Sequence, residues 1–336
     1  MTTIKDIAKE AGVSYTTVSN VIHGRTSRVS SQTIAQINEI IKRSGYAPNM
    51  SARSLVSNSS KVIGIINHLV PKASGGFIAD PFHSAFIGAV EETLRENGYY
   101  LMLRTVEDSM DLLSFLRNWN IDGMFFTGLF EDEFFDTLSS VDVPIVLIDS
   151  YINHPNMQNV GLEDYKGGYL ATKYLIENGH RNIAFASPPI RSHGVVEERL
   201  RGYRQALDEF HIPYQEQFLF QGEFDVQSDM LLSRQIAAHK EITAVFATAD
   251  ILAAGIIAGL HDIGLNVPND ISVVGFDDVT LCQLISPTLT TIHQDTVEKG
   301  KAAVEFMMNR LNNNRVEEHQ KILPVHLIER KSVKRI

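Results

Sequence analysis

The chain of 336 residues is predicted to hold a small all-α headpiece with a helix-turn-helix and a hinge helix, followed by an α/β core of two doubly wound parallel-sheet subdomains. Three observations predict this architecture. Apolar residues recur at helical spacing up to about residue 43. Beyond residue 61, short apolar runs alternate with helical runs. The net charge also changes sign between these two parts.

The helix-turn-helix is predicted from the first part of the headpiece. Thr3 is a good N-cap for a helix over 4–11. Gly12 can take the positive φ that ends this helix and begins a tight turn. Ser14 then caps a second helix over about 15–22.

The second helix is predicted to have a buried and an exposed face. Val18 and Val21 or Ile22 recur at helical spacing and face inward. The side chains left on the exposed face are Tyr15, Thr16, Thr17, Ser19 and Asn20. Hydrogen-bonding side chains at the start of such a helix are typical of a recognition helix, which enters the major groove of DNA.

The headpiece is predicted to continue through a third helix and a hinge. The third helix covers about 32–43, and Pro48 prevents it from continuing. Asn49 can cap a further helix over 50–56. Because that helix is too short to be stable alone, we expect it to form on DNA.

The charge distribution favours contact between the headpiece and nucleic acid. Residues 1–60 contain seven Lys and Arg and three Asp and Glu, a net charge of +4, whereas the whole chain carries −10, which leaves −14 for the rest. A basic head on an acidic body places the attraction for phosphate at one end of the chain.

The core alternates predicted strands and helices. Residues 145–148 form an unbroken apolar run, as expected of a strand that is buried on both faces. The predicted strands are 62–70, 100–105, 123–128, 144–150, 160–163, 182–187, 217–222, 244–248, 271–277 and 289–293. The predicted helices are 82–97, 109–119, 131–139, 164–178, 196–210, 226–238, 249–263 and 296–312. This alternation is typical of doubly wound parallel sheets.

The core lacks the signatures of enzymes that share such sheets. The patterns G-x-G-x-x-G, G-x-x-x-x-G-K-[ST], G-x-S-x-G and H-E-x-x-H are absent. Cys282 is the single cysteine, which excludes an intrachain disulfide and a multi-cysteine metal site and fits a reducing cytoplasm. No stretch approaches the ~20 apolar residues of a membrane span, and the start has no apolar signal region. We therefore predict no catalytic residue, metal, cofactor or membrane contact, and a cytoplasmic location.

Several sequence blocks occur in a specific order and spacing. In the headpiece they are Asp6-Ile7-Ala8, Ala11-Gly12-Val13-Ser14, Thr17-Val18-Ser19, Gly45-Tyr46, Pro48-Asn49 and Ala52-Arg53-Ser54-Leu55. Together they resemble the headpiece and hinge of the lactose-repressor (LacI/GalR) family of bacterial transcription regulators. The core blocks that resemble the same family are Ile63-Gly64-Ile65, Leu175-Ile176-Glu177-Asn178-Gly179-His180, Arg199-Leu200-Arg201-Gly202-Tyr203, Val274-Gly275-Phe276-Asp277-Asp278, Pro287-Thr288-Leu289-Thr290-Thr291-Ile292 and Leu327-Ile328-Glu329-Arg330. The resemblance thus covers nearly the whole chain.

The resemblance implies a core with the fold of periplasmic sugar-binding proteins, in which the chain crosses three times between subdomains. We place the crossings near residues 162, 291 and 325. The predicted domains are a headpiece over 1–48, a hinge over 49–60 and a core over 61–336, with one subdomain of 61–161 plus 292–324 and the other of 162–290 plus 326–336. No tail remains for a tetramerising helix, which favours a homodimer.

The resemblance also implies roles in DNA contact. Tyr15, Thr16 and Asn20 match positions that read base edges. The family often has arginine in place of Asn20, and asparagine prefers adenine where arginine prefers guanine. The other residues predicted to contact DNA are Thr3, Ser14, Thr17, Ser19, Arg25, Asn49, Ala52, Arg53 and Leu55. Leu55 matches the apolar wedge that enters the minor groove between base steps.

An effector site is implied at the carboxyl ends of the core strands, in the cleft between subdomains. Arg199 and Asp277 match an arginine and an aspartate with which the family binds effectors, and such a donor and acceptor suit polyhydroxy ligands. The remaining predicted effector-binding residues are Phe82, His83, Asp149, Phe224 and Asp250. Three alternatives stay open: Arg199 in a structural ion pair with a carboxylate such as Asp277, Asp250 as a helix cap, and Phe82 and Phe224 as core residues.

The sequence therefore predicts a sequence-specific DNA-binding transcriptional regulator, a repressor. Its partners are a near-palindromic double-stranded DNA operator, a second copy of the chain in a homodimer, and a small-molecule effector. The predicted effector is a sugar or sugar derivative. Two alternatives remain: the same regulator responding to a purine-type effector, and a cytoplasmic sugar-binding or sugar-processing protein with an incidental helical head.

Overall fold

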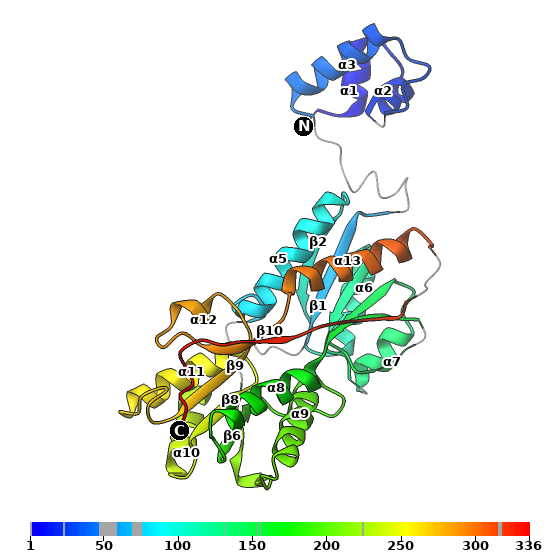
Figure 1. The fold of residues 1–336 in the computed structure, drawn as a ribbon. Coiled ribbons are helices and arrows are strands. Elements are labelled where there is room, and N and C mark those ends of the chain that lie inside the picture. Colours follow the sequence, from blue (N-terminus) through cyan, green and yellow to red (C-terminus); the bar gives the residue numbers. More distant parts are fainter. Residues whose placement is uncertain are drawn as a thin grey trace. The chain divides into compact units, whose positions relative to one another are not determined.

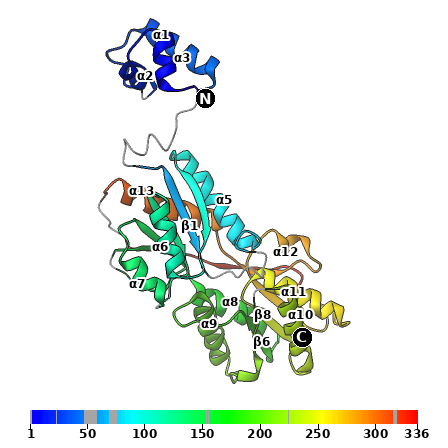
Figure 2. The same ribbon diagram turned by 180° about the vertical axis from the view of Figure 1, so that it is seen from behind.

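The computed structural model describes residues 2–22, 24–46, 59–68, 76–130, 132–152, 154, 156–223, 225–314 and 318–336. The chain divides into two compact units, Met1–Ser60 and Lys61–Ile336, which Figures 1 and 2 show from opposite sides. Among the described residues, no helix combines the length and the apolar character needed to cross a membrane.

The headpiece is a group of three short helices, as predicted. They are α1 Ile4–Ala11, α2 Tyr15–Ile22 and α3 Ser31–Ser44. A capping box begins α1, because the Thr3 hydroxyl accepts from the backbone N–H of Asp6 and the Asp6 carboxylate accepts from that of Thr3. Gly12 ends α1 with a φ of 67°, which allows the tight turn into α2. The predicted hinge helix over 50–56 lies outside the described residues.

A small aliphatic core holds the three headpiece helices together. Its buried residues are Ile7, Ala8, Ala11, Val18, Val21, Ile37 and Ile40. Tyr46 packs against this cluster at the end of the described headpiece. The inward face of α2 is therefore the one that the helical spacing predicts.

The first sheet of the core has the strand order β2-β1-β3-β4-β5-β11, with every neighbouring pair parallel. Its strands are β1 Val62–Asn67, β2 Tyr100–Thr105, β3 Gly123–Thr127, β4 Ile145–Ile148, β5 Gln158–Leu162 and β11 Gln320–Leu323. Its helices are α5 Pro81–Glu96, α6 Ser109–Asn118, α7 Glu133–Ser139 and α13 Thr296–Leu311. Helices α5 and α13 lie side by side on one face, and α6 and α7 cover the other (Figures 1 and 2).

The second sheet repeats this pattern in the order β7-β6-β8-β9-β10-β12, and only its last pair, β10 with β12, is antiparallel among the described strands. Its strands are β6 Ile183–Ser187, β7 Leu219–Gln221, β8 Ala244–Ala247, β9 Ser272–Asp277, β10 Thr290–His293 and β12 His326–Ile328. Its helices are α8 Asp164–Glu177, α9 Val195–Glu209, α10 Val226–Ala238, α11 Asp250–Asp262 and α12 Leu281–Leu284, with a 3-10 turn over Glu216–Phe218.

Two predictions about the end of the core need correction. The expected subdomain boundary at 291–292 falls inside β10, which pairs with β9 as far as His293 opposite Asp277. Because α13 packs on α5 and on strands of the first sheet, the chain crosses after His293. The strands β11 and β12 are not predicted, since both are short edge strands that lack a clear apolar pattern, and Leu323 is their one buried residue.

Helices α8 and α9 approach each other unusually closely. A side chain on Gly168 would collide with the backbone of Arg199, and one on Gly202 would collide with the backbone of Tyr165. The two glycines therefore permit backbone-to-backbone packing. This packing brings Asp164, at the start of α8, against Arg199 on α9.

Candidate functional site

The recognition helix α2 exposes polar and aromatic side chains at its start. Tyr15 is 54% exposed and Thr16 is also exposed, while Thr17, Ser19 and Asn20 are half-buried. Val18 and Val21 on the opposite face are buried. The helix thus has the two-faced character that insertion into a DNA groove requires.

Two predicted DNA-contacting hydroxyls are engaged within the headpiece. The Thr3 hydroxyl donates to the Asp6 carboxylate at 2.7 Å, and this bond helps to hold the pKa of Asp6 below its ordinary value. The Ser14 hydroxyl accepts from the backbone N–H of Thr17 at 3.1 Å and so caps α2. Arg25 is exposed. The other predicted positions on this surface, Asn49, Ala52, Arg53 and Leu55, lie outside the described residues.

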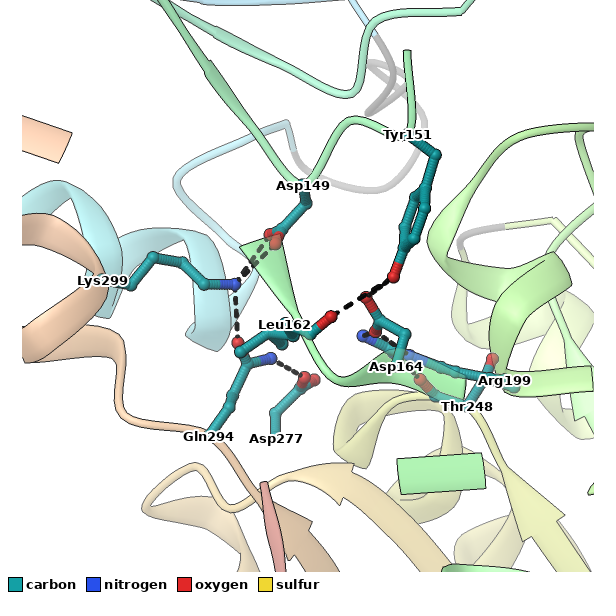
Figure 3. Close-up of polar contacts among 9 residues, drawn as sticks. All are labelled: Asp149, Tyr151, Leu162, Asp164, Arg199, Thr248, Asp277, Gln294 and Lys299. Carbon is teal, nitrogen blue, oxygen red and sulfur yellow. Dashed lines mark hydrogen bonds and ion pairs between the residues drawn. The ribbon is translucent and has the colours of Figure 1, made fainter. Parts of the chain in front are cut away.

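A network of polar side chains joins the two sheets of the core (Figure 3). Asp149 follows β4 of the first sheet, and Asp277 ends β9 of the second. Lys299 on α13 donates to both carboxylate oxygens of Asp149 at 2.8 Å and to Gln294 Oε1 at 2.8 Å. Gln294 Nε2 donates in turn to Asp277 Oδ1 at 2.5 Å. One continuous chain of contacts therefore links two of the predicted effector carboxylates.

Arg199 belongs to a second group of polar contacts in the same region (Figure 3), which we include in the network although no side-chain hydrogen bond between described residues joins the two groups. Its Nε donates to Asp164 Oδ1 at 2.8 Å, its Nη1 donates to the carbonyl of Thr248 at 2.6 Å, and the guanidinium lies 3.5 Å from the centre of the Phe276 ring. The Tyr151 hydroxyl donates to Asp164 Oδ2 at 2.7 Å. Arg199 does form a structural ion pair, as one alternative proposed, but its partner is Asp164 and not Asp277.

Both strand-end carboxylates sit on unusual backbone. Asp149 has a φ of 52° and Asp277 a φ of 121°. Residues other than glycine seldom adopt positive φ, and each such conformation costs on the order of 1–3 kcal/mol, which the surrounding structure must offset. Backbone strain of this kind gathers at ligand sites, so its presence at both carboxylates supports a functional role.

Burial dominates the electrostatics of the network. It raises the pKa of Asp277 well above the ordinary value and also raises the pKa of Asp164, although the charge of Arg199 opposes both shifts. Burial opposes the charge of Arg199 too, but Asp164 keeps the Arg199 pKa above its ordinary value. Ionised carboxylates are therefore costly here, which favours a ligand that brings hydrogen-bond donors.

The remaining predicted effector residues divide between the network and the protein interior. Phe82, at the start of α5, places its ring 5.0 Å from Lys299 Nζ. His83 is held instead by Asp80, whose Oδ1 lies 2.9 Å from the His83 Nδ1. Asp250 is fully buried and accepts from the Thr291 hydroxyl and the Val279 backbone N–H.

Those bonds give Asp250 a structural role. Asp250 is not a helix cap, because no side-chain cap hydrogen bond is made at the start of α11. Burial raises the pKa of Asp250 to about 6. Phe224 lies outside the described residues. No group of three or more His, Cys, Asp or Glu among the described residues is suited to a metal ion.

Sequence reasoning missed Lys299, Gln294, Asp164 and Tyr151. One signal was available for Lys299, because Ala302, Ala303 and Phe306 follow it at i+3, i+4 and i+7 and mark the buried face of α13. A lysine on such a face is rarely buried without a charged partner. The carboxylate that pairs with Lys299 lies 150 positions earlier in the chain, so no local sequence pattern identifies it.

The first unit is a basic helix-turn-helix, and the core holds a polar network between its two sheets. Together these features define a class of ligand-responsive DNA-binding regulators. Comparison with known protein families supports this class. Residues 3–49 match the profile of "Bacterial regulatory proteins, lacI family", and residues 172–333 match that of "Periplasmic binding protein-like domain".

Full-length relatives lead to the same family. The chain is 36% identical to the HTH-type transcriptional repressor PurR of Pectobacterium carotovorum subsp. carotovorum (strain PC1), over 99% of this chain and 97% of the relative. The chain therefore belongs to the LacI family. It is a DNA-binding transcriptional repressor whose activity a small molecule modulates. Because the family profile covers the head itself, the head is not incidental to a sugar-processing protein.

Solved structures of related regulators share the fold. The transcriptional regulator CelR in complex with cellobiose is 28% identical with a TM-score of 0.74, over 99% of this chain and 100% of that one. A Lac repressor dimer bound to operator and the anti-inducer ONPF is 25% identical with a TM-score of 0.84, over 99% of both chains. The predicted fold class and family are thus confirmed.

Proposed function

We propose that this repressor acts in the cytoplasm as a homodimer on a near-palindromic operator, and that its effector binds at the network around Asp149, Arg199 and Asp277. The observation that carries the proposal is the continuous chain of contacts between carboxylates of the two sheets. A ligand that contacts both sheets shifts the equilibrium between two arrangements of the sheets only if it binds one arrangement more tightly than the other. The Lac repressor dimer bound to operator supports the dimeric assembly.

The chemistry of the network defines what the ligand must offer. Gln294 uses Oδ1 of Asp277, and no donor among the described residues bonds to Oδ2. Oδ2 is therefore the proposed acceptor for a ligand N–H or O–H. Arg199 uses Nε and Nη1 for Asp164 and Thr248, and its Nη2 also lies 2.8 Å from Asp164 Oδ1. The second N–H of each Nη atom is therefore the proposed donor to a ligand oxygen or ring nitrogen.

A purine-type effector is the first candidate, because the full-length relatives at 36% identity are repressors named PurR. A purine offers adjacent donors and acceptors, and the Phe82 ring provides a flat apolar surface close to the network. A sugar is the second candidate, since the structurally similar CelR holds cellobiose. Both ligands suit an aspartate and an arginine, so the choice needs a direct measurement.

Thermal unfolding of the full-length protein with purine bases, purine nucleosides, monosaccharides and disaccharides separates the two candidates. We expect the purine set to raise the melting temperature, because bound ligand stabilises the folded state. Shifts confined to sugars would reject the purine candidate, and no shift with any compound would reject the site as proposed.

The variant Asp277→Asn tests the site. Replacing the acceptor Oδ2 with an amide of the same shape is expected to weaken the best ligand by about 5- to 150-fold, which corresponds to the ~1–3 kcal/mol cost of leaving a buried donor without its partner. Isothermal titration measures the loss. Asp262→Asn, on the exposed end of α11, is the control. Equal affinity in Asp277→Asn and wild type would move the effector elsewhere.

A further inference from the structure

Lys299 is a lysine with no exposed surface. It lies on α13, a helix of the first sheet, among the buried residues that pack this helix on α5. Burying an ammonium group is costly unless acceptors replace its hydration. Lys299 is not among the residues that the sequence singles out, and the proposed function gives it no contact with the effector.

The ammonium group of Lys299 has three N–H donors, and three acceptors surround it. These are Oδ1 and Oδ2 of Asp149 and Oε1 of Gln294, each at 2.8 Å. With its donors used in this way, Lys299 is suited to hold protein groups in place and not to bind a ligand itself.

The contact with Lys299 determines which way the Gln294 amide points. Because Oε1 faces the ammonium group, Nε2 faces the other way and donates to Asp277 Oδ1 at 2.5 Å. A reversed amide would place its NH₂ group against the ammonium group, and this contact would be repulsive. Figure 3 shows Gln294 between Lys299 and Asp277.

We infer that Lys299 is a positioning residue that couples the two sheets: by orienting Gln294, it ties Asp149 and α13 of the first sheet to Asp277 of the second. The inference rests on the proposed function only in taking Asp277 to face the effector. It identifies the contact through which the state of the effector site is passed to the arrangement of the sheets.

The test measures the distance between the sheets without any ligand. Spin labels at Arg117→Cys on α6 and Gln205→Cys on α9, both exposed positions, report that distance by electron–electron double resonance, with labelled chains diluted by unlabelled ones. Cys282 is buried and stays unlabelled. We expect one narrow peak for the otherwise native chain and loss of that peak in Lys299→Met. Lys301→Met, an exposed site on the same helix, is the matched control.

A second variant tests whether Lys299 acts by orienting Gln294 or only by neutralising the charge of Asp149. Asparagine tolerates the positive φ at position 149, so the pair Lys299→Met with Asp149→Asn removes the unpaired charge without new strain. We expect this pair to regain the native melting temperature but not the narrow peak. Recovery of the peak together with stability would overturn the inference, as would an unchanged peak in Lys299→Met.

If the paired variant remains destabilised, Gln294→Met decides the question with Lys299 left intact. Loss of the narrow peak supports the inference, and retention of the peak overturns it. Because no ligand is added in any arm, failure to find an effector would reject the proposed function and leave this result unaffected.

Discussion

At the scale of single residues, Asn20 is the position on α2 with the clearest consequence for DNA sequence. It lies between the buried residues Val18 and Val21, on the polar side of the helix. An asparagine side chain can form two hydrogen bonds with the N6 and N7 atoms of adenine, whereas arginine does so with O6 and N7 of guanine. We therefore expect the identity of this side chain to affect the preference for one base pair in each half-site.

We predict that Asn20→Arg changes the preferred base from adenine to guanine at one position of each half-site. A good bidentate contact contributes about 1–3 kcal/mol of discrimination, so selection from a randomised DNA duplex should show the change clearly. Thr16→Ser, which keeps a hydroxyl on the same face, is the comparison variant. If Asn20→Arg and the wild-type protein select the same base at every position, Asn20 does not read a base edge.

The residues of the candidate site show what local sequence can and cannot predict. Asp277 was predicted because it ends an apolar strand and matches a ligand-binding aspartate of the family that the chain resembles, and Asp149, after another such strand, was a weaker candidate. Lys299 and Gln294 were missed because their roles depend on partners in other elements. Periodicity indicates which face of a helix is buried, but not which charged side chains of other elements contact that face.

At the scale of elements, the packing of α10 on α11 contains a buried acid. Asp229 on α10 is 7% exposed, and its carboxylate lies against Gly255 of α11, where any side chain would collide with it. Burial, with a contribution from the charge of Asp225, raises the Asp229 pKa from 3.8 to about 7. Ionising Asp229 therefore works against the packing of these helices.

The raised pKa predicts how stability depends on pH. Between the unfolded pKa and the folded pKa, the folded state binds more protons, so the contribution of Asp229 to stability is lost as pH rises from about 4 to 7. The full effect is on the order of 4 kcal/mol at 1.36 kcal/mol per pKa unit. We predict that Asp229→Asn raises the melting temperature at pH 8 by on the order of 5 °C, and that the gain vanishes near pH 4.

Calorimetry across that pH range measures the effect, with Asp208→Asn on the exposed side of α9 as the control. A gain that is equal at pH 4 and pH 8 would show that Asp229 does not titrate in this interval. Comparing each variant with wild type at the same pH removes the contribution of other groups.

The elements themselves were largely predictable, with informative exceptions. Headpiece helices α1 and α2 have the predicted bounds, because Thr3, Gly12 and Ser14 mark their ends. In the core, strands buried on both faces stood out as apolar runs. The edge strands β11 and β12 did not, since half of their surroundings is solvent and their pairing depends on the final crossing of the chain.

At the scale of the whole molecule, the chain consists of two units with separate apolar cores. The headpiece cluster draws all its described residues from positions 4 to 46, and the other clusters draw theirs from the core. Each unit therefore has the internal packing that independent folding requires. The lacI-family profile covers the first unit, and the proposed effector site lies in the second.

We predict that a fragment of residues 61–336 folds and gives the same ligand-induced thermal shift as the full chain, because every described residue of the network lies within it. The same fragment should give no specific gel shift with an operator obtained by selection. Circular dichroism and thermal unfolding with the best ligand check the first expectation. A fragment that folds but loses the ligand shift would mean that the headpiece contributes to the effector site.

The segments that cross between the sheets also carry side chains of the network. Asp164 comes two residues after β5, where the chain enters the second sheet, and Gln294 comes directly after β10, where it returns to the first. Anyone converting this repressor into a biosensor for a new compound should therefore leave these two positions unchanged. If the proposed site is right, diversifying Phe82 and its neighbours on α5 instead is expected to alter ligand preference while the proposed connection between the sheets is kept.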